Sequence, residues 1–324
     1  MAQAFIDVAR VGEVSLPMMG GMTKSVHVID KRTILALNAA LATQRPLLVR
    51  GEPGIGKSQL ARAAAVLLGR TFLTHAVDAR TETRDLLWTL DAVARLATAQ
   101  LMSALQEAQK ADVLERVHML NFVKPGPLWW AFDWQDAENQ ARRANATIPL
   151  SPADWTPDLG SVVLIDEIDK ADASVPNGLL DALGHGRFDV EGRAPVTMNA
   201  ARLPLVIMTT NEERAMPDAF LRRCVVLHLE LPRETDKLIV ELMIRGRAHF
   251  GKTIDSVLLE AAKQLAQDRE KHQQQDLAPP GLAEYIDLVR AVTEQCPGNE
   301  KEQLELLREI KSFMYEKHPQ ETSR

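Results

Sequence analysis

The sequence predicts an α/β fold built on a parallel sheet, followed by a smaller all-α domain. Three observations lead to this prediction. An apolar run at residues 46–49 precedes a glycine-rich loop and a helical stretch, which is the order found at phosphate-binding loops. Residues 161–165 and 203–210 form further apolar runs typical of strands buried on both faces. Beyond residue 232 the strand signals stop and helical patterns replace them.

The glycine-rich loop is the most specific feature of the chain. Its glycines allow successive backbone N–H groups to point at phosphate oxygens, and the following helix adds the positive end of its dipole. Lys57 is expected to reach the β- and γ-phosphates, and Ser58 to hold Mg²⁺. A chance glycine turn is the alternative, but every fixed position is present and both flanks are correct. The loop residues are Gly51, Glu52, Pro53, Gly54, Ile55, Gly56, Lys57 and Ser58.

Two carboxylates follow the second buried strand. Asp166 and Glu167 stand directly after residues 161–165, at the strand end where open α/β sheets place ligands. Asp166 is predicted to hold Mg²⁺, and Glu167 to polarise the attacking water as a general base. An acidic loop after any buried strand is the plain alternative. The neighbouring phosphate loop favours the functional interpretation.

Three further polar residues lie at or after the end of the next strand. Asn211 ends it, where a carboxamide can orient water or contact the γ-phosphate, although asparagine also commonly begins helices and turns. Arg222 and Arg223 precede a last strand at residues 225–229. The simplest interpretation is that these two arginines are ordinary solvent-exposed surface residues. In this context we expect an arginine finger, which stabilises charge on a transferring phosphoryl group, with Arg223 the better candidate.

Composition excludes several other classes. The chain has 324 residues, a net charge of −6 and a pI near 5.8, whereas nucleic-acid binders usually carry a basic footprint. Its two cysteines indicate no disulfide framework. No stretch approaches the roughly 18 apolar residues of a membrane span, and residues 1–10 lack a signal core. We therefore expect a cytoplasmic protein without membrane contact, and a nucleic-acid partner is disfavoured.

The order of these segments resembles Walker A, Walker B, sensor 1 and arginine finger of AAA+ ATPases, and more narrowly the MoxR family. Residues 166–171 (DEIDKA) resemble the family's "DEINRA", and residues 124–129 its "GPIF" element. Residues 83–87 resemble its "DLLG" stretch, although Trp88 replaces the glycine. Residues 179–192 match its "LLEAM" helix and the hairpin that follows. The likeness covers residues 30–232 well and the C-terminal region in outline.

The resemblance implies an ATP- and Mg²⁺-dependent ATPase that forms a homo-oligomeric ring, usually a hexamer. MoxR-like proteins commonly serve as chaperones or assembly factors, often with a partner that carries a von Willebrand A domain. The nucleotide is expected between core and lid, with Arg223 supplied by the neighbouring subunit. Two rival functions stay open: a nucleotide-operated regulatory switch, and, less favoured, a nucleic-acid motor or loader.

Two departures from the family pattern stand out. Family members usually carry a sensor-2 arginine at the start of a lid helix, but residues 278–283 here contain none, and Arg290 is the substitute further along. The interval between Lys57 and Asp166 is also long. We expect two inserts to fill it: a helical one at about residues 81–132 and a loop-like one at about residues 133–159.

The remaining elements complete the predicted organisation. Residues 1–232 are assigned to the nucleotide-binding domain and 233–324 to the lid, with a hairpin at about 186–201 that faces the pore in related ATPases. We further predict a helix at 31–43, a strand at 71–78, and lid helices at 234–250, 254–269, 282–294 and 302–315. Four tryptophans gather between 129 and 155. For these tryptophans we favour a role in packing the insert against the core over a role in a partner-binding surface.

Overall fold

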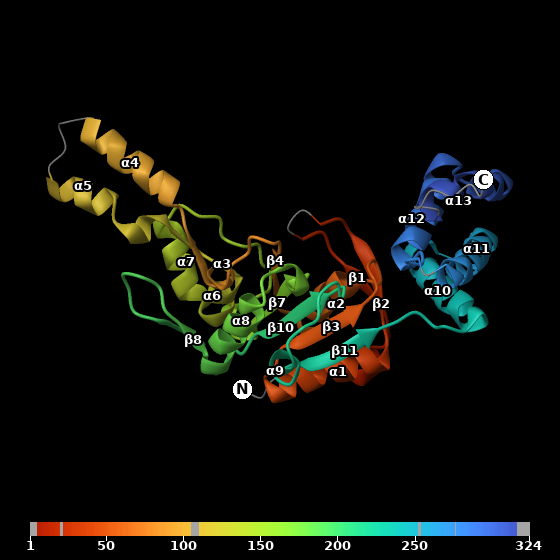
Figure 1. The fold of residues 1–324 in the computed structure, drawn as a ribbon, viewed down its shortest axis with the longest axis horizontal. Coiled ribbons are helices and arrows are strands. Elements are labelled where there is room, and N and C mark those ends of the chain that lie inside the picture. The colour runs from red at the N-terminus through yellow and green to blue at the C-terminus, as the bar shows by residue number, and fades with distance from the viewer. Residues whose placement is uncertain (1–4, 20–21, 105–109, 252–253, 276, 316–324) are drawn as a thin grey trace.

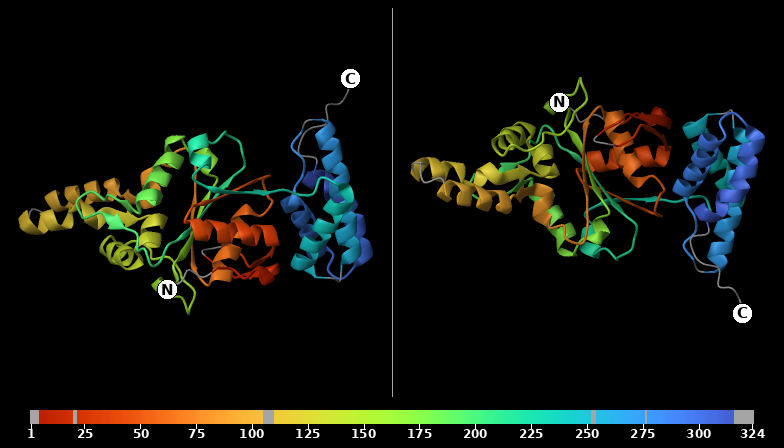
Figure 2. Two further views of the ribbon diagram at one scale, coloured as in Figure 1. Left: turned by 90° about the horizontal axis from the view of Figure 1, so that it is seen from below. Right: turned by 90° about the horizontal axis from the view of Figure 1, so that it is seen from above.

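The computed structural model describes residues 5–19, 22–104, 110–251, 254–275 and 277–315. The described chain is elongated (Figure 1), and its central sheet domain lies between two helical parts. At one end a helical arm projects, formed by α4 (Ala92–Ala104) and α5 (Lys110–Arg116). At the other end lies a bundle of helices, and Figure 2 shows the same separation from two further directions.

The central sheet of the described residues has five parallel strands in the order β11-β3-β10-β7-β4. The first five residues of β7 and all six of β10 are buried, as expected for strands covered on both faces. This confirms the parallel α/β sheet, and all its carboxyl ends meet at one edge. The strands are β3 (Leu47–Gly51), β4 (Thr71–Ala76), β7 (Ser161–Asp166), β10 (Leu205–Thr210) and β11 (Val225–Leu229).

Alternate residues of β3, β4, β7 and β10 enter separate hydrophobic clusters on the two faces of the sheet. Val162 and Leu164 pack with α1 (Lys31–Thr43), α2 (Lys57–Leu68) and an N-terminal hairpin. Val163 packs on the opposite face with α6 (Pro127–Phe132) and α8 (Ser174–His185). This domain also contains α3 (Thr83–Leu87), α7 (Trp134–Arg143), α9 (Asp218–Leu221) and the short 3₁₀ turns η1 (Val8–Arg10), η2 (Met119–Phe122), η3 (Pro157–Leu159) and η4 (Ile168–Lys170).

The N-terminal hairpin is an element that the sequence did not predict. β1 (Gly12–Leu16) and β2 (Ser25–Ile29) pair antiparallel, and their buried side chains join the α1–α2 cluster. β2 also contacts α10 (Thr235–Phe250) of the helical bundle. Residues 1–25 have weak periodicity because these strands are short and half exposed.

The insert is more structured than its sequence indicates. The helical insert expected at residues 81–132 is interrupted, because β5 (Trp88–Leu90) pairs antiparallel with β6 (Val123–Pro125) before α4 begins. The segment after residue 132 was expected to be loop-like, and this is wrong for its first part. There α7 forms as a helix capped by the Asp133 carboxylate, with Ala137 and Ala141 buried.

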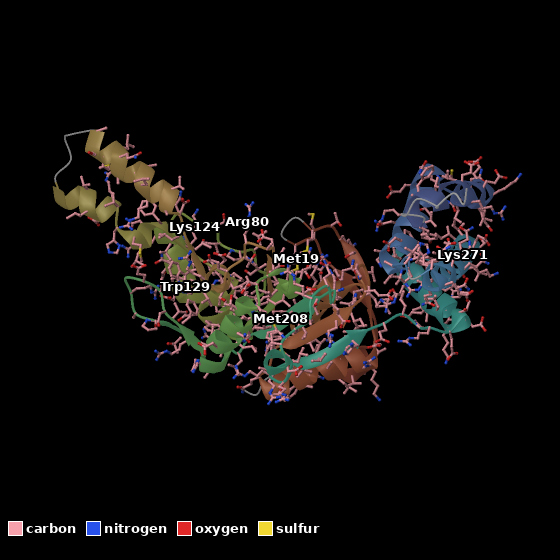
Figure 3. The ribbon with its side chains drawn as sticks, in the orientation of Figure 1. Met19, Arg80, Lys124, Trp129, Met208 and Lys271 are labelled. Carbon is pink, nitrogen blue, oxygen red and sulfur yellow. The ribbon has the colours of Figure 1, made fainter. Side chains whose placement is uncertain are left out.

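The tryptophans of the insert favour the packing interpretation. Trp129, labelled in Figure 3, is fully buried and belongs to the hydrophobic cluster that also contains Met208 of β10. Trp130 is also buried, and Trp134 links it to Trp155, with ring centroids 4.8 and 4.5 Å apart. These side chains join the insert to the domain core.

The hairpin predicted at residues 186–201 is present as β8 (Arg187–Phe188) and β9 (Val196–Thr197). Its connecting segment rests on the insert. Arg193 donates to both oxygens of Asp136 at 2.8 Å, and its guanidinium lies 4.8 Å from the Trp129 ring centroid. The hairpin and the insert are therefore tied by a charge-assisted contact.

The helical bundle has its own core. Its helices, confirmed close to the predicted bounds, are α10 (Thr235–Phe250), α11 (Asp255–Gln274), α12 (Leu282–Gln295) and α13 (Glu300–Tyr315). Leu242, Leu258 and Tyr285 are fully buried among them. Of the helices in the described residues, none is both long and apolar enough to cross a bilayer.

Candidate nucleotide site

The glycine-rich loop connects β3 to α2 at the carboxyl edge of the sheet. Gly54 and Gly56 have φ of +74° and +99°, which is the left-handed region that favours glycine. A Cβ at Gly54 would also lie 2.7 Å from the Cβ of Ala283 in the lid. Gly56 is the N-cap residue of α2, whose first residue is Lys57. The predicted strand–loop–helix unit is therefore present, with the helix N-terminus at the loop.

A cavity of about 960 Å³ lies against this loop. Its walls come from the loop and α2, the ends of β7 and β10, residues 22–25 at the start of β2, and α10 and α12 of the helical bundle. This volume lies at the upper end of the usual range for small-molecule pockets. The residues predicted for phosphate, magnesium and water binding that line it are Pro53, Gly54, Gly56, Lys57, Ser58, Asp166, Glu167 and Asn211.

Lys57 is held at the loop by hydrogen bonds. Its Nζ donates to the carbonyl oxygens of Gly51 at 2.7 Å and Glu52 at 3.0 Å, and to Asn211 Oδ1 at 2.6 Å. Burial lowers the pKa of Lys57, whereas the negative charge of Asp166 raises it. The ammonium is thus held between the loop and Asn211, and Lys57 lines the cavity.

Ser58 and Asp166 come together from α2 and β7. The Ser58 hydroxyl donates to the two carboxylate oxygens at 3.0 and 2.9 Å, and the Thr209 hydroxyl donates to Oδ1 at 2.5 Å. A hydroxyl and a carboxylate are hard oxygen donors that suit Mg²⁺, which keeps several waters and shares phosphate oxygens. No cluster of three His, Cys, Asp or Glu side chains exists in the described residues, so a protein-only metal cage is not built there. The pair fits a Mg²⁺–nucleotide complex.

Glu167 and Asn211 are neighbours at the ends of adjacent strands. Asn211 Nδ2 donates to Glu167 Oε1 at 3.2 Å, while Oε2 accepts from Lys170. The hydrogen bond from Lys170 is the main cause that lowers the pKa of Glu167, so this carboxylate is ionised at neutral pH. Its backbone has φ +60°, a left-handed conformation that costs a non-glycine residue about 1–3 kcal/mol. Its N–H donates to Thr209 Oγ1 at 2.8 Å, which helps to hold this conformation.

Sequence reasoning missed Thr209 and Lys170 as parts of the site. Thr209 touches both Asp166 and the backbone of Glu167, and Lys170 pairs with the Glu167 carboxylate. The available signal for Thr209 was its place two residues before Asn211, in a strand that otherwise reads as apolar. Lys170 lies three residues after Glu167, where the η4 turn brings it back.

The two arginine candidates lie outside this group. Arg222 and Arg223 follow α9, which the fully buried Phe220 anchors, and both side chains are exposed. Neither belongs to the cavity wall formed by the described residues. Within one chain the structure therefore does not bring them to Lys57 and Glu167.

Two loop residues have side chains that contact the helical bundle. The Glu52 carboxylate pairs with Arg269 of α11, and the Ile55 side chain belongs to the hydrophobic core of the helical bundle. Only the backbone of these two residues remains for the phosphate interaction predicted from the sequence.

Arg290 lines the cavity from α12, and its guanidinium donates to Asp287 at 2.9 Å. Replacing Arg290 with alanine is expected to weaken ATP binding about tenfold or more while affecting ADP less, because a charge-assisted hydrogen bond to the γ-phosphate contributes about 1.5–3 kcal/mol. Calorimetry with both nucleotides measures the difference. Arg308→Ala, an exposed position on α13, is the control. Equal losses for ATP and ADP would exclude a γ-phosphate contact.

Comparison with known proteins gives similar solved structures and a family match, whereas no curated protein matches the chain. Two mutants of RuvB from Thermotoga maritima are among the similar structures. One is 15% identical, with TM-score 0.44 and coverage of 87% of this chain and 69% of that one. The other is 16% identical, with TM-score 0.45 and coverage of 86% and 68%. A candidate ATPase from Cytophaga hutchinsonii is 13% identical, with TM-score 0.38 and coverage of 87% and 79%.

The family model that matches is the AAA domain of the dynein-related subfamily. The match spans residues 46–224, more than half of the 324-residue chain. It begins just before β3 and ends just before β11, so it contains the phosphate loop, both carboxylates, Asn211 and the two arginines. The chain belongs to the AAA domain family, dynein-related subfamily, and is an ATP hydrolase of the AAA+ class.

Proposed function

We propose that this protein is a Mg²⁺-ATP-dependent AAA+ ATPase of MoxR type that works as a ring and remodels or assembles a partner protein. The observation that carries the proposal is the meeting of Lys57, Ser58, Asp166, Glu167 and Asn211 at one cavity between core and lid. One of the MoxR-like segments, residues 166–171, supplies Asp166 and Glu167 to the cavity wall, which supports the narrower assignment.

In this proposal each side chain has a separate task. Lys57 and the loop N–H groups bind the phosphates, and Asn211 orients both the attacking water and the Glu167 carboxylate. Glu167 takes the proton from that water as it attacks the γ-phosphorus. Ser58 and Asp166 would hold Mg²⁺, which supplies charge neutralisation on the phosphate oxygens when bound.

The ring is proposed from the position of the arginines. Because Arg222 and Arg223 are exposed and lie outside their own cavity wall, a neighbouring copy is the natural acceptor for them. Arg223 would then stabilise the transferring phosphoryl group of the adjacent subunit. A hexamer, and a client or partner protein with a von Willebrand A domain, follow from the MoxR resemblance.

A regulatory switch is the second candidate, and two observations favour it. Residues 278–283 offer no arginine to the γ-phosphate, and Lys170 engages the Glu167 carboxylate. A switch would hydrolyse ATP slowly and respond to a partner rather than to DNA. The acidic net charge counts against a nucleic-acid motor.

The decisive experiment measures assembly and turnover together. Tagged Glu167→Gln protein is expected to form a ring on addition of Mg²⁺-ATP, detected as an increase in mass by light scattering, and to retain a partner protein in that state.

Lys57→Ala protein is expected neither to bind ATP in calorimetry nor to assemble, because the phosphates lose their main cationic ligand. Wild-type turnover measured with and without DNA separates the candidates. Unchanged ATP affinity in Lys57→Ala would refute the phosphate-loop assignment.

A further inference from the structure

The phosphate loop and the lid form a continuous contact. Ile55 is 3% exposed and packs in the same hydrophobic cluster as Leu238 and Leu282 of the lid. The backbone at Gly54 lies so close to Ala283 that a Cβ there would meet the alanine side chain at 2.7 Å. Because of this contact, a movement of the loop would displace α12 directly.

A two-pronged ion pair crosses the same boundary. Arg269 Nη1 and Nη2 donate to Glu52 Oε2 and Oε1, each at 2.9 Å, and Nη1 also donates to the Pro280 carbonyl at 2.7 Å. The Arg269 side chain is only 9% exposed, whereas Glu52 is 42% exposed. A bidentate guanidinium–carboxylate pair is strong and has a defined direction, so it transmits a rotation of either partner. It joins α11 and the start of α12 to the loop.

Glu52 also touches the phosphate-binding lysine. Its carbonyl accepts from Lys57 Nζ at 3.0 Å, while its carboxylate holds Arg269. The same ammonium donates to Asn211, which in turn donates to Glu167. A line of hydrogen bonds thus runs from the lid through Glu52 and Lys57 to the proposed general base.

We infer that Arg269 is a positioning residue that makes the lid follow the state of the phosphate loop, acting through Glu52. The inference rests on the proposed binding of ATP by Lys57. Phosphate oxygens compete with the Glu52 carbonyl for the lysine ammonium, and the released peptide is then free to turn. The Glu52 carboxylate turns with it, and Arg269 passes the movement to α11 and Pro280.

Arg269 fits this task better than the other lid arginine near the cavity. Arg290 is about half exposed, and the ion pair that the structure gives it lies within α12, to Asp287. Arg269 is nearly buried, and its carboxylate partner lies 217 residues away in the loop. Coupling between lid and loop therefore does not require a lid arginine on the γ-phosphate.

The test measures lid movement in the whole chain. Two spectroscopic labels are placed on cysteines introduced at exposed Lys31 in the core and Lys301 in the lid, in a Cys296→Ser, Glu167→Gln background that blocks hydrolysis. ATP is expected to change the distance between the labels. Glu52→Gln and Arg269→Gln should each abolish at least half of this change. Because lid closure adds to binding, both should weaken ATP about five- to 150-fold, the usual range of a coupling between sites.

The control is a matched ion pair inside the lid. Arg247 also binds a carboxylate, Asp255, with two nitrogens at 2.9 and 2.7 Å, but makes this pair within the lid. Arg247→Gln should leave the ATP-driven change intact. Should Arg269→Gln unfold the lid, Glu52→Gln still tests the inference, because it removes one half-exposed charge from the loop. A full distance change in Glu52→Gln, or ATP binding by the parent without any change, overturns the inference. A parent that does not bind ATP refutes the proposed function instead.

Discussion

Replacing Arg223 with alanine is expected to slow ATP hydrolysis about 10³- to 10⁵-fold, which is the usual effect of removing an arginine finger. The expected reason is that Arg223 neutralises charge on the phosphoryl group in the neighbouring subunit. Its exposed position after α9, outside the wall of its own cavity, agrees with action in trans. Steady-state phosphate release measures the effect, and Arg222→Ala in the same assay shows which arginine reaches across.

Mixing variants distinguishes trans from cis action. Arg223→Ala and Glu167→Gln proteins should each be nearly inactive, whereas their mixture should recover part of the activity. At some interfaces a subunit with intact Glu167 meets a neighbour with intact Arg223. Subunit exchange is first verified by tagged pull-down. If exchange occurs and the mixture stays inactive, then either Arg223 does not act in trans or hydrolysis needs an unbroken ring of intact sites.

Replacing Glu167 with glutamine is expected to leave ATP binding unchanged and to lower the rate about 10²- to 10⁴-fold, the usual effect of losing a general base. The carboxamide keeps the shape and the contact to Asn211, but it cannot accept the proton. The hydrogen bond from Lys170 lowers the pKa of Glu167, so the wild-type carboxylate is ionised at neutral pH and has a free acceptor for the proton that the carboxamide lacks.

Calorimetry and phosphate release together test this second prediction. Glu212→Gln is the control, because this nearby carboxylate pairs with Arg50 and does not line the cavity wall of the described residues. The control is expected to hydrolyse ATP within about twofold of wild type. If Glu167→Gln does the same, another group is the base, and Asp169 is examined next. Asp169 is buried in the η4 turn that follows Glu167.

The strand, glycine-rich loop and helix could be predicted because their signal is local. Residues 51–58 are contiguous, and the chemistry depends on backbone N–H groups and on a lysine and a serine at set spacing. The buried strands were predictable for a similar reason, since covering both faces of a sheet requires uninterrupted apolar runs such as those of β7 and β10. The lid helices followed from their periodicity.

The partners of the site residues could not be predicted in this way. Thr209 reaches Asp166 from a strand 43 residues away, and Glu52 turns from the phosphate position to Arg269. Neither contact can be predicted from local periodicity, because each depends on which strand ends and lid surfaces lie next to each other in the folded protein. The N-terminal hairpin and α7 were missed for a related reason, as packing against neighbours stabilises short elements with weak local signals.

The sequence by itself thus determined the phosphate loop, the parallel sheet and the order of the polar residues at the strand ends. Tertiary structure alone decided how these residues are held: Glu167 in a left-handed conformation between Lys170 and Asn211, and the loop bound to the lid by Ile55 and the Glu52–Arg269 pair. The physical reason is the separation along the chain of the groups that interact. Backbone conformation and strand burial follow from neighbours in the chain, whereas charge pairing and side-chain direction follow from groups that only folding brings together.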